Sequence, residues 1–260
     1  MNSGLEKYYA QRVKHLGNHL LDFETSLEEE LLHEFRVELK KMRALIKFLQ
    51  KIHGKAAVKK TKELLDLVFH TAGTLREFQL IRNWLLANRL TGIEAKFSRE
   101  NLIPANFGHF FSGHPGFAKK LQQALHKSAR LIEKTGQDIT DKYAEELKKN
   151  ILEKINALAP ASSWHSIRKL LKQWIYACNW TSLPEQAKNR TLKNFSQLQE
   201  AIGIWHDNQL LSNYFASIHS AILKDPYLLK EWGFGTKKIN TALKSSSAKV
   251  LKLLKNLLLN

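Results

Sequence analysis

The chain contains 260 residues, with 41 Lys and Arg against 24 Asp and Glu, so its formal net charge is +17. A hydrophobic content of 43% is ample for a buried core, as one large domain or two small ones. The single cysteine, Cys178, excludes an intramolecular disulfide, and no stretch reaches the roughly 18 uncharged apolar residues of a membrane span. The surplus of positive charge attracts polyanions, which include nucleic acid, polyphosphate, acidic membranes and acidic proteins. The first residues lack the apolar segment of a secretory signal, so we expect a cytoplasmic protein.

Apolar residues recur every three or four positions along most of the chain, which is the period of an amphipathic helix. Within 31–52 this set includes Leu32, Phe35, Leu39 and Met42. No alternating strand pattern stands out, and four of the five prolines fall between the periodic segments. We therefore predict an all-α fold. Further helices are expected over 5–23, 55–72, 76–89, 117–158, 164–180, 185–202, 206–223 and 236–258.

A stretch rich in Gly, Pro, Asn and Phe, 91–116, interrupts the helical pattern. Its aromatic residues indicate an ordered, packed loop. The loop divides the chain into two halves, 1–113 and 114–260, and the second half is the more basic. It holds 23 basic and 11 acidic residues, against 18 and 13 in the first half.

Three segments of the first half recur in the second half in the same order, which indicates an internal duplication. The aligned segments are 31–48 with 163–180, 72–80 with 202–210, and 119–125 with 237–243. The matched pairs include His33 with His165, Arg36 with Arg168, Lys40 with Lys172, and Gly73 with Gly203. A duplicated helical chain most simply forms two tandem antiparallel four-helix bundles related by an internal pseudo-two-fold axis.

A stripe of one charge sign follows the predicted helix over 31–52. Its members alternate steps of three and four residues, so they share one helix face: His33, Arg36, Lys40, Arg43 and Lys47. Solvated helix faces usually mix acidic residues into such a stripe at i,i+4, whereas this one has none. Arginine can hold phosphate through two parallel hydrogen bonds, and lysine adds a mobile charge. The stripe therefore favours an anion-binding surface over a solvated face.

Other chemistry has weaker support in the sequence. The 11 histidines form no HExxH motif and no Cys cluster accompanies them, so we expect no metal site and no cofactor. A hydrogen-bonded core histidine is an alternative role for His33. No phosphate-binding glycine loop and no nucleophile motif occur, so we expect no enzymatic activity. We expect Glu77 and Asp207, the repeated acids, to orient the basic residues that precede them, Arg76 and His206.

Two amphipathic basic segments, 147–158 and 250–260, are compatible with membrane-surface helices, but packing within a bundle is the favoured interpretation, and no membrane partner is expected. Tryptophans can stack on nucleic-acid bases. Four of them fall near apolar helix positions, where core packing is favoured: Trp164, Trp174, Trp180 and Trp205.

The segment "HEFRVELKKMRALIKFL" resembles the signature helix of the CHAD domain, the conserved-histidine α-helical domain, in which basic residues follow a histidine at +3, +7 and +10. The segments "GTLREFQL" and "GIWHDNQL" resemble the second motif of that family, a Gly followed by an Arg-Asp pair that opens the next helix. The resemblance covers nearly the whole chain, so we expect one CHAD domain over residues 1–260.

The resemblance implies two four-helix bundles with pseudo-two-fold symmetry around a basic groove that binds inorganic polyphosphate, and an association with polyphosphate granules. The acidic signature of the triphosphatase domain to which some members are fused is missing here, so non-enzymatic binding is expected. Binding roles carry over to His33, Arg36, Lys40, Arg43, His165, Arg168 and Lys172.

The second half departs from the family pattern at two positions. Ile175 stands where a basic residue is usual, and His206 stands where an arginine is expected. We add Lys47, Arg76 and His206 to the expected site, together with the aligned pair Lys60 and Arg190. Nucleic acid is the alternative ligand, because nothing in the sequence excludes a phosphodiester backbone. Exposed aromatic residues within the stripe would favour it, and the stripe has none.

Overall fold

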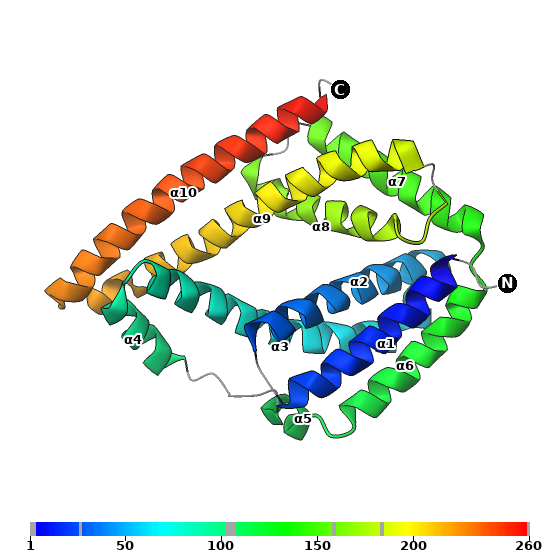
Figure 1. Cartoon of the computed structure of the whole chain (residues 1–260), viewed down its shortest axis with the longest axis horizontal. Helices are drawn as coiled ribbons and strands as arrows, with labels where there is room; N and C mark the ends of the chain where they lie inside the picture. The colour runs from blue at the N-terminus through cyan, green and yellow to red at the C-terminus, as the bar shows by residue number, and fades with distance from the viewer. Residues whose placement is uncertain (1–3, 26–27, 102–107, 158–159, 183–184, 259–260) are drawn as a thin grey trace. The chain divides into compact units, whose positions relative to one another are not determined.

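The computed structural model describes residues 4–25, 28–101, 108–157, 160–182 and 185–258. All regular structure in these ranges is helical, with ten helices and no strand, which confirms the predicted all-α class (Figure 1). The helices are α1 (Gly4–Thr25), α2 (Glu29–His53), α3 (Lys55–Ala87), α4 (Thr91–Glu100), α5 (Gly108–Gly113), α6 (Phe117–Glu133), α7 (Gln137–Asn156), α8 (Ala161–Ala177), α9 (Glu185–Ile222) and α10 (Pro226–Leu258). None of the described helices is long and apolar enough to cross a membrane.

The helices form two compact units. Unit 1 comprises Met1–Arg76, Pro104–Asn150 and Gln173–Asn189, and unit 2 comprises Glu77–Ile103, Ile151–Lys172 and Arg190–Asn260. The units interleave along the sequence, so they describe a different division from the repeat halves 1–113 and 114–260. The division into these two units therefore does not test the internal duplication, which stays a prediction.

The core of unit 1 contains the apolar face of α2. The four residues that indicated this helix, Leu32, Phe35, Leu39 and Met42, are fully buried. Helices α1 and α6 pack against α2, and the hydroxyl of Tyr9 on α1 donates a hydrogen bond of 2.7 Å to a carbonyl of α6. Burial of each large apolar side chain contributes about 1.5–3 kcal/mol to the stability of the fold. The buried apolar face therefore determines which side of α2 is directed toward solvent.

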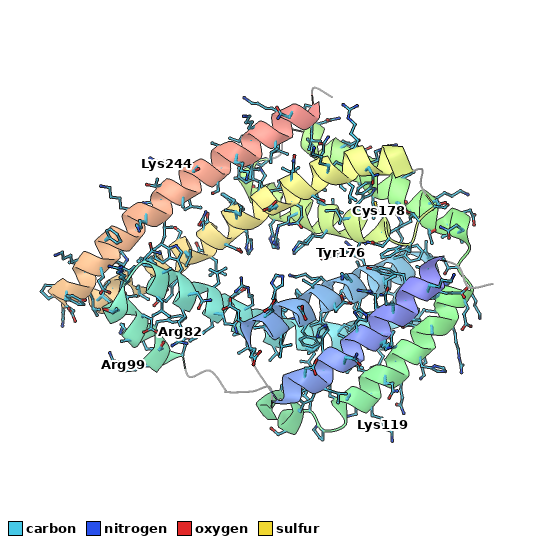
Figure 2. All side chains as sticks on the ribbon, in the orientation of Figure 1. Arg82, Arg99, Lys119, Tyr176, Cys178 and Lys244 are labelled. Atoms are coloured by element: carbon cyan, nitrogen blue, oxygen red, sulfur yellow. The ribbon has the colours of Figure 1, made fainter. Side chains whose placement is uncertain are left out.

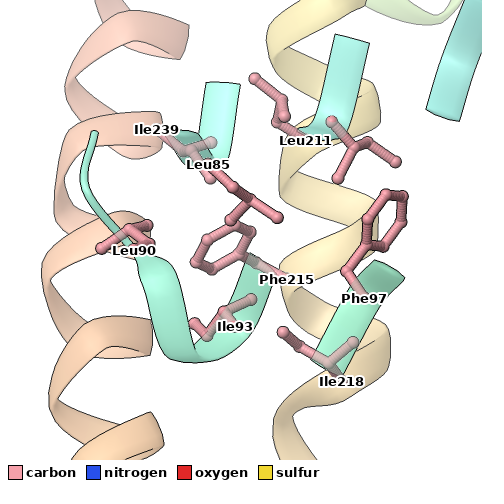
Figure 3. Close-up of a cluster of buried hydrophobic side chains, with 9 residues drawn as sticks. Leu85, Leu90, Ile93, Phe97, Leu211, Phe215, Ile218 and Ile239 are labelled. Atoms are coloured by element: carbon pink, nitrogen blue, oxygen red, sulfur yellow. The ribbon is translucent and has the colours of Figure 1, made fainter. Parts of the chain in front are cut away.

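The core of unit 2 forms where the end of α3, α4, α9 and α10 meet (Figure 3). Its buried members are Ile81, Leu85, Leu90, Ile93, Phe97, Leu211, Phe215, Ile218 and Ile239. Three of the tryptophans for which core packing is predicted are buried: Trp164 in unit 2, and Trp174 and Trp180 in unit 1. Trp205 is half-buried and packs edge-on against Trp164.

Several helix boundaries differ from those predicted. Helices α3 and α9 run without interruption through Gly73 and Gly203, where the sequence pattern indicated breaks. The predicted helix over 117–158 is two helices, α6 and α7, which are separated at residues 134–136. The hydroxyl of Thr135 donates to the Leu131 carbonyl, which satisfies a terminal acceptor of α6 where the chain turns.

The interval 91–116 is predicted to be a loop, but it contains two helices, α4 and the short α5. The carboxylate of Glu231 on α10 accepts hydrogen bonds from the backbone N–H groups of Gly92 (3.2 Å) and Ile93 (2.9 Å). This acceptor satisfies donors that a helix N-terminus leaves unpaired. Because the acceptor lies 139 residues away in the sequence, local reasoning could not find it. Residues 102–107 of the interval lie outside the described residues.

Candidate anion-binding site

The basic stripe of α2 lies at the border between the core of unit 1 and solvent. Arg36, Lys40 and Arg43 are half-buried, while His33 and Lys47 are exposed at its two ends. Half-burial is expected for long cationic side chains whose stems pack on apolar surface and whose charged ends remain hydrated. The structure therefore places these five residues on one side of α2, as predicted.

One aromatic ring of α3 gathers two arginines of the stripe. The guanidinium carbon of Arg43 lies 3.9 Å from the ring centroid of Phe69, and that of Arg36 lies 4.9 Å from the same centroid. Arg36 Nη1 also donates to the Phe69 carbonyl at 3.4 Å. Arg36 and Arg43 begin two turns apart on α2, about 10.5 Å along the axis, so the shared ring brings their guanidinium groups together. Each cation–π contact contributes roughly 0.5–2 kcal/mol and restricts the orientation of its guanidinium.

The carboxylate of Asp66 holds the same region from α3. Arg43 Nε donates to its Oδ1 at 2.8 Å, and Lys62 Nζ donates to its Oδ2 at 2.6 Å. Burial alone would raise the pKa of Asp66, but the hydrogen bonds and positive charges of Lys62 and Arg43 outweigh that effect and lower it. Asp66 is therefore ionised at neutral pH and fixes Arg43 against the ring of Phe69.

A glycine on α3 makes room for Arg36. A Cβ atom at Gly73 would lie 3.3 Å from Arg36 Nη1, closer than most real contacts of this kind. In unit 2, a Cβ atom at Gly203 on α9 would lie 3.2 Å from Arg168 Nη2 on α8. The same arginine–glycine contact thus occurs in each unit, between residue pairs that the sequence alignment matched.

The basic stripe of α2 forms the first basic cluster, and the second basic cluster lies in unit 2. His165, Arg168 and Lys172 are half-buried on α8, and His206 approaches from α9. The rings of His165 and His206 stack with centroids 4.9 Å apart and an interplanar angle of 22°. Burial lowers the pKa of His165, and the nearby cations Lys169, Arg168 and Lys172 lower it further. His165 is therefore neutral at pH 7, with one ring N–H available as a donor.

A model of the CHAD domain matches residues 7–215. The chain belongs to the CHAD family. The matched region contains both basic clusters and ends before α10 begins. No curated protein matches the sequence.

The two CHAD clusters differ in their supporting residues. At the offset that aligns Gly73 with Gly203, Ser196 and Gln199 stand in place of Asp66 and Phe69. Ile175, which replaces Arg43, is half-buried. The second cluster therefore has neither the aromatic ring nor the carboxylate that orient the arginines of the first.

The sequence predicts that Glu77 orients Arg76 and that Asp207 orients His206, and the structure agrees for the second pair only. His206 Nδ1 lies 3.7 Å from Asp207 Oδ1, the neighbour expected to orient it. Arg76, expected to be held by Glu77, donates instead to Glu29 at the start of α2, at 3.0 Å. Arg76 thereby connects α3 to the N-terminal end of the basic stripe.

Two of the predicted CHAD site residues do not join the clusters. Nine residues separate Lys60 from Phe69, which places them about 180° apart around α3. Thirteen residues separate Arg190 from Gly203, which places them about 140° apart around α9. Both side chains are exposed, on faces directed away from the arginine–glycine contacts.

His33 also borders a cavity of about 520 Å³ between α1 and α2. The cavity is lined by His15, Asn18, His19, Asp22, His33, Glu34, Val37, Glu38 and Lys41. Its three carboxylates, Asp22, Glu34 and Glu38, make the cavity a poor site for a phosphate chain, so the candidate surface for an anion is the Arg36 side of His33. Among the residues described, no three His, Cys, Asp or Glu side chains are grouped to hold a metal ion.

Three supporting residues of the first cluster were missed at the sequence level: Lys62, Asp66 and Phe69. A signal for them exists in the spacing of Asp66, Phe69, Gly73 and Arg76, which alternate steps of three and four and share one face of α3. The face became recognisable only through its contacts with α2.

Proposed function

We propose that the chain binds inorganic polyphosphate through its two basic clusters and does not catalyse a reaction on it. The observation that carries the proposal is the repeated contact of Arg36 with Gly73 and of Arg168 with Gly203. In each unit a glycine leaves space that a guanidinium occupies, within a region that matches the CHAD family, which is associated with polyphosphate binding. An arginine held in this way loses less conformational entropy when it binds an anion.

Each basic residue has a role in the proposal. Phosphate oxygens accept hydrogen bonds from the charged side chains of both clusters: Arg36, Lys40, Arg43, Arg168 and Lys172. His33 and His165 donate from ring N–H groups, and Arg76 and His206 approach from α3 and α9. Lys47 extends the first cluster by one turn. Lys60 and Arg190 are left out of the contact surface because they face away from the clusters.

The contacts of the Asp66 carboxylate, which binds Arg43 of the first cluster, support binding without catalysis. Phosphoryl chemistry commonly uses carboxylates to hold Mg²⁺. Asp66 is instead bound to Arg43 and Lys62. Incubation of the protein with long-chain polyphosphate and Mg²⁺ tests this point, because release of inorganic phosphate would contradict it.

Two broader statements belong to the same proposal. The halves of the chain are duplicated four-helix bundles, since the matched arginine–glycine contacts occur once in each half. In the cell the protein is cytoplasmic and associates with polyphosphate granules, as the family resemblance implies.

The test compares binding of long-chain polyphosphate with binding of single- and double-stranded nucleic acid at physiological salt. The variant Arg36→Glu/Lys40→Glu should lose most polyphosphate affinity. The control Lys119→Glu/Lys127→Glu makes the same charge change at exposed positions of α6 in the same unit. The control should bind nearly as well as the wild type. Circular dichroism establishes that each variant is folded.

Two results would contradict the proposal. The first is a folded Arg36→Glu/Lys40→Glu variant that keeps its polyphosphate affinity. The second is nucleic acid binding as tightly as polyphosphate with the same dependence on Arg36 and Lys40, which would support the alternative ligand. Affinity for polyphosphate should also fall as salt rises, because binding releases condensed counterions.

A further inference from the structure

Helix α10 presents a surface of one charge sign outside the region that matches the CHAD family. All seven of its lysines are exposed: Lys230, Lys237, Lys238, Lys244, Lys249, Lys252 and Lys255. Figure 2 labels one of them, Lys244, on the α10 ribbon. The helix has one acidic residue, Glu231, which is 8% exposed and accepts the hydrogen bonds from α4. Every charged side chain that α10 exposes to solvent is therefore a lysine.

The first part of this face also carries two exposed aromatic rings. Tyr227 is 59% exposed and Phe234 is 50% exposed. They are seven residues apart, so they lie on nearly the same side of α10, about 10.5 Å from each other along the axis. Lys230 lies between them, and Lys237 and Lys238 follow one turn later. We call these five residues the α10 patch.

Contacts within unit 2 hold the patch in place. Gly92 on α4 leaves space for the Tyr227 ring, since a Cβ there would lie 2.8 Å from Cε1. Lys238 Nζ donates to Asn88 Oδ1 at 2.8 Å and lies 4.9 Å from the centroid of the Phe234 ring. Asp225, two residues before Tyr227, accepts hydrogen bonds from the backbone N–H groups of Tyr227 and Leu228 at the start of α10. Its charge is thus directed at the helix N-terminus.

We infer that the α10 patch binds single-stranded nucleic acid. Bases stack on Tyr227 and Phe234, while Lys230 and Lys237 contact the backbone phosphates. Exposed aromatics interleaved with cations are the combination that single-strand binders use, because every base has a π face and every nucleotide has a negative charge. The basic stripe of α2 lacks this combination, since the two aromatic residues of the same helix, Phe35 and Phe48, are fully buried.

The other polyanions fit the patch less well. Inorganic polyphosphate has no base, so two exposed rings would contribute nothing to its binding. A membrane-surface helix inserts a continuous apolar stripe into lipid. The apolar stripe of α10, which includes Ile239, Val250 and Leu254, is buried within unit 2.

The experiment measures fluorescence anisotropy of a labelled single-stranded oligothymidylate with the full chain. The variant Tyr227→Ala/Phe234→Ala should weaken binding at least about tenfold, because both stacking platforms are lost. The variant Tyr227→Trp/Phe234→Trp should keep the affinity, whereas Tyr227→Leu/Phe234→Leu, which retains apolar bulk without a ring, should behave as the alanine variant. Leu251→Ala changes an exposed apolar residue of the same helix and should have no effect.

Polyphosphate binding, measured on the same proteins, separates this inference from the proposed function. The patch variants should bind polyphosphate as the wild type does, and Arg36→Glu/Lys40→Glu should keep its affinity for the oligonucleotide. Unchanged oligonucleotide binding by folded Tyr227→Ala/Phe234→Ala would overturn the inference. Failure of the wild type to bind the oligonucleotide, with patch-dependent binding to vesicles containing phosphatidylserine, would overturn it in favour of a membrane surface.

Discussion

Gly73 lies so close to Arg36 that the arginine guanidinium occupies the space of a side chain at position 73. A Cβ atom there would be 3.3 Å from Nη1 of Arg36, and the corresponding distance between Gly203 and Nη2 of Arg168 is 3.2 Å. Both glycines lie inside continuous helices, where glycine is destabilising by about 0.5–1 kcal/mol relative to alanine. Glycine therefore lowers the stability of each helix at these positions, and the space that it leaves for an arginine explains its presence.

Replacement of Gly73 by alanine should separate stability from binding. The added methyl group favours the helix but displaces the Arg36 guanidinium by a few tenths of an ångström. We expect unchanged or higher stability to urea, together with polyphosphate affinity lowered about fivefold, roughly 1 kcal/mol. The control Gly17→Ala lies on α1, with no atom within 4 Å of the added Cβ, and should change affinity very little. Equal affinities for Gly73→Ala and the wild type would show that the position of Arg36 is unimportant.

Phe69 should affect the strength of binding without altering its electrostatic character. Phe69→Leu removes the ring that gathers Arg36 and Arg43 but no charge. We expect affinity to fall by about three- to tenfold, which corresponds to the loss of one or two cation–π contacts. The slope of log affinity against log salt should be unchanged, because the number of phosphate-neutralising cations is the same. Titration calorimetry at several salt concentrations measures both quantities, and Phe69→Tyr, which keeps the ring, should bind as the wild type does.

The sequence predicted α2 and its stripe because one helix period encodes both the buried and the basic positions. Leu32 and Phe35 are buried as expected, and Arg36 and Lys40 lie at the edge of the core. The contact of Arg36 with Gly73 could not be predicted in this way, since the period of one helix does not specify which residue of the next helix it meets. A glycine within a helical pattern predicts a break, although Gly73 instead makes a tertiary contact with Arg36 inside a continuous helix.

The same limit applied to residues whose partners are distant in the sequence. Asp66 and Phe69 support the first cluster through contacts across 23 and 33 residues. Glu231 stabilises the start of α4 from 139 residues away. Local propensity gave no reason to expect either arrangement, because each arises only after the helices pack.

Asp66 should link the stability of the protein to pH. Its pKa is lower in the folded state than in the unfolded chain, so its contribution is fully present above the unfolded value of about 3.9 and is lost as pH falls through the folded value. The wild type should therefore exceed Asp66→Asn in unfolding free energy at neutral pH, and the difference should shrink in acid. Urea unfolding at a series of pH values measures this difference. A difference that does not vary with pH would mean that the ion pairs with Arg43 and Lys62 do not stabilise the fold.

His165 should couple polyphosphate binding to proton uptake. In the free protein, burial and the cations Lys169, Arg168 and Lys172 lower its pKa, and Asp207 is the acidic residue near its stacked partner His206. A bound phosphate chain adds negative charge, which favours the imidazolium form, so the pKa of His165 is higher in the complex. Affinity should therefore increase as pH falls through the pKa of His165 in the complex and become constant below its pKa in the free protein.

Calorimetry in buffers of different ionisation enthalpy measures the number of protons taken up on polyphosphate binding. His165→Gln should reduce that number, while His126→Gln, an exposed histidine of α6, should leave it unchanged. Equal proton uptake by His165→Gln and the wild type would contradict the coupling and place the titrating group elsewhere.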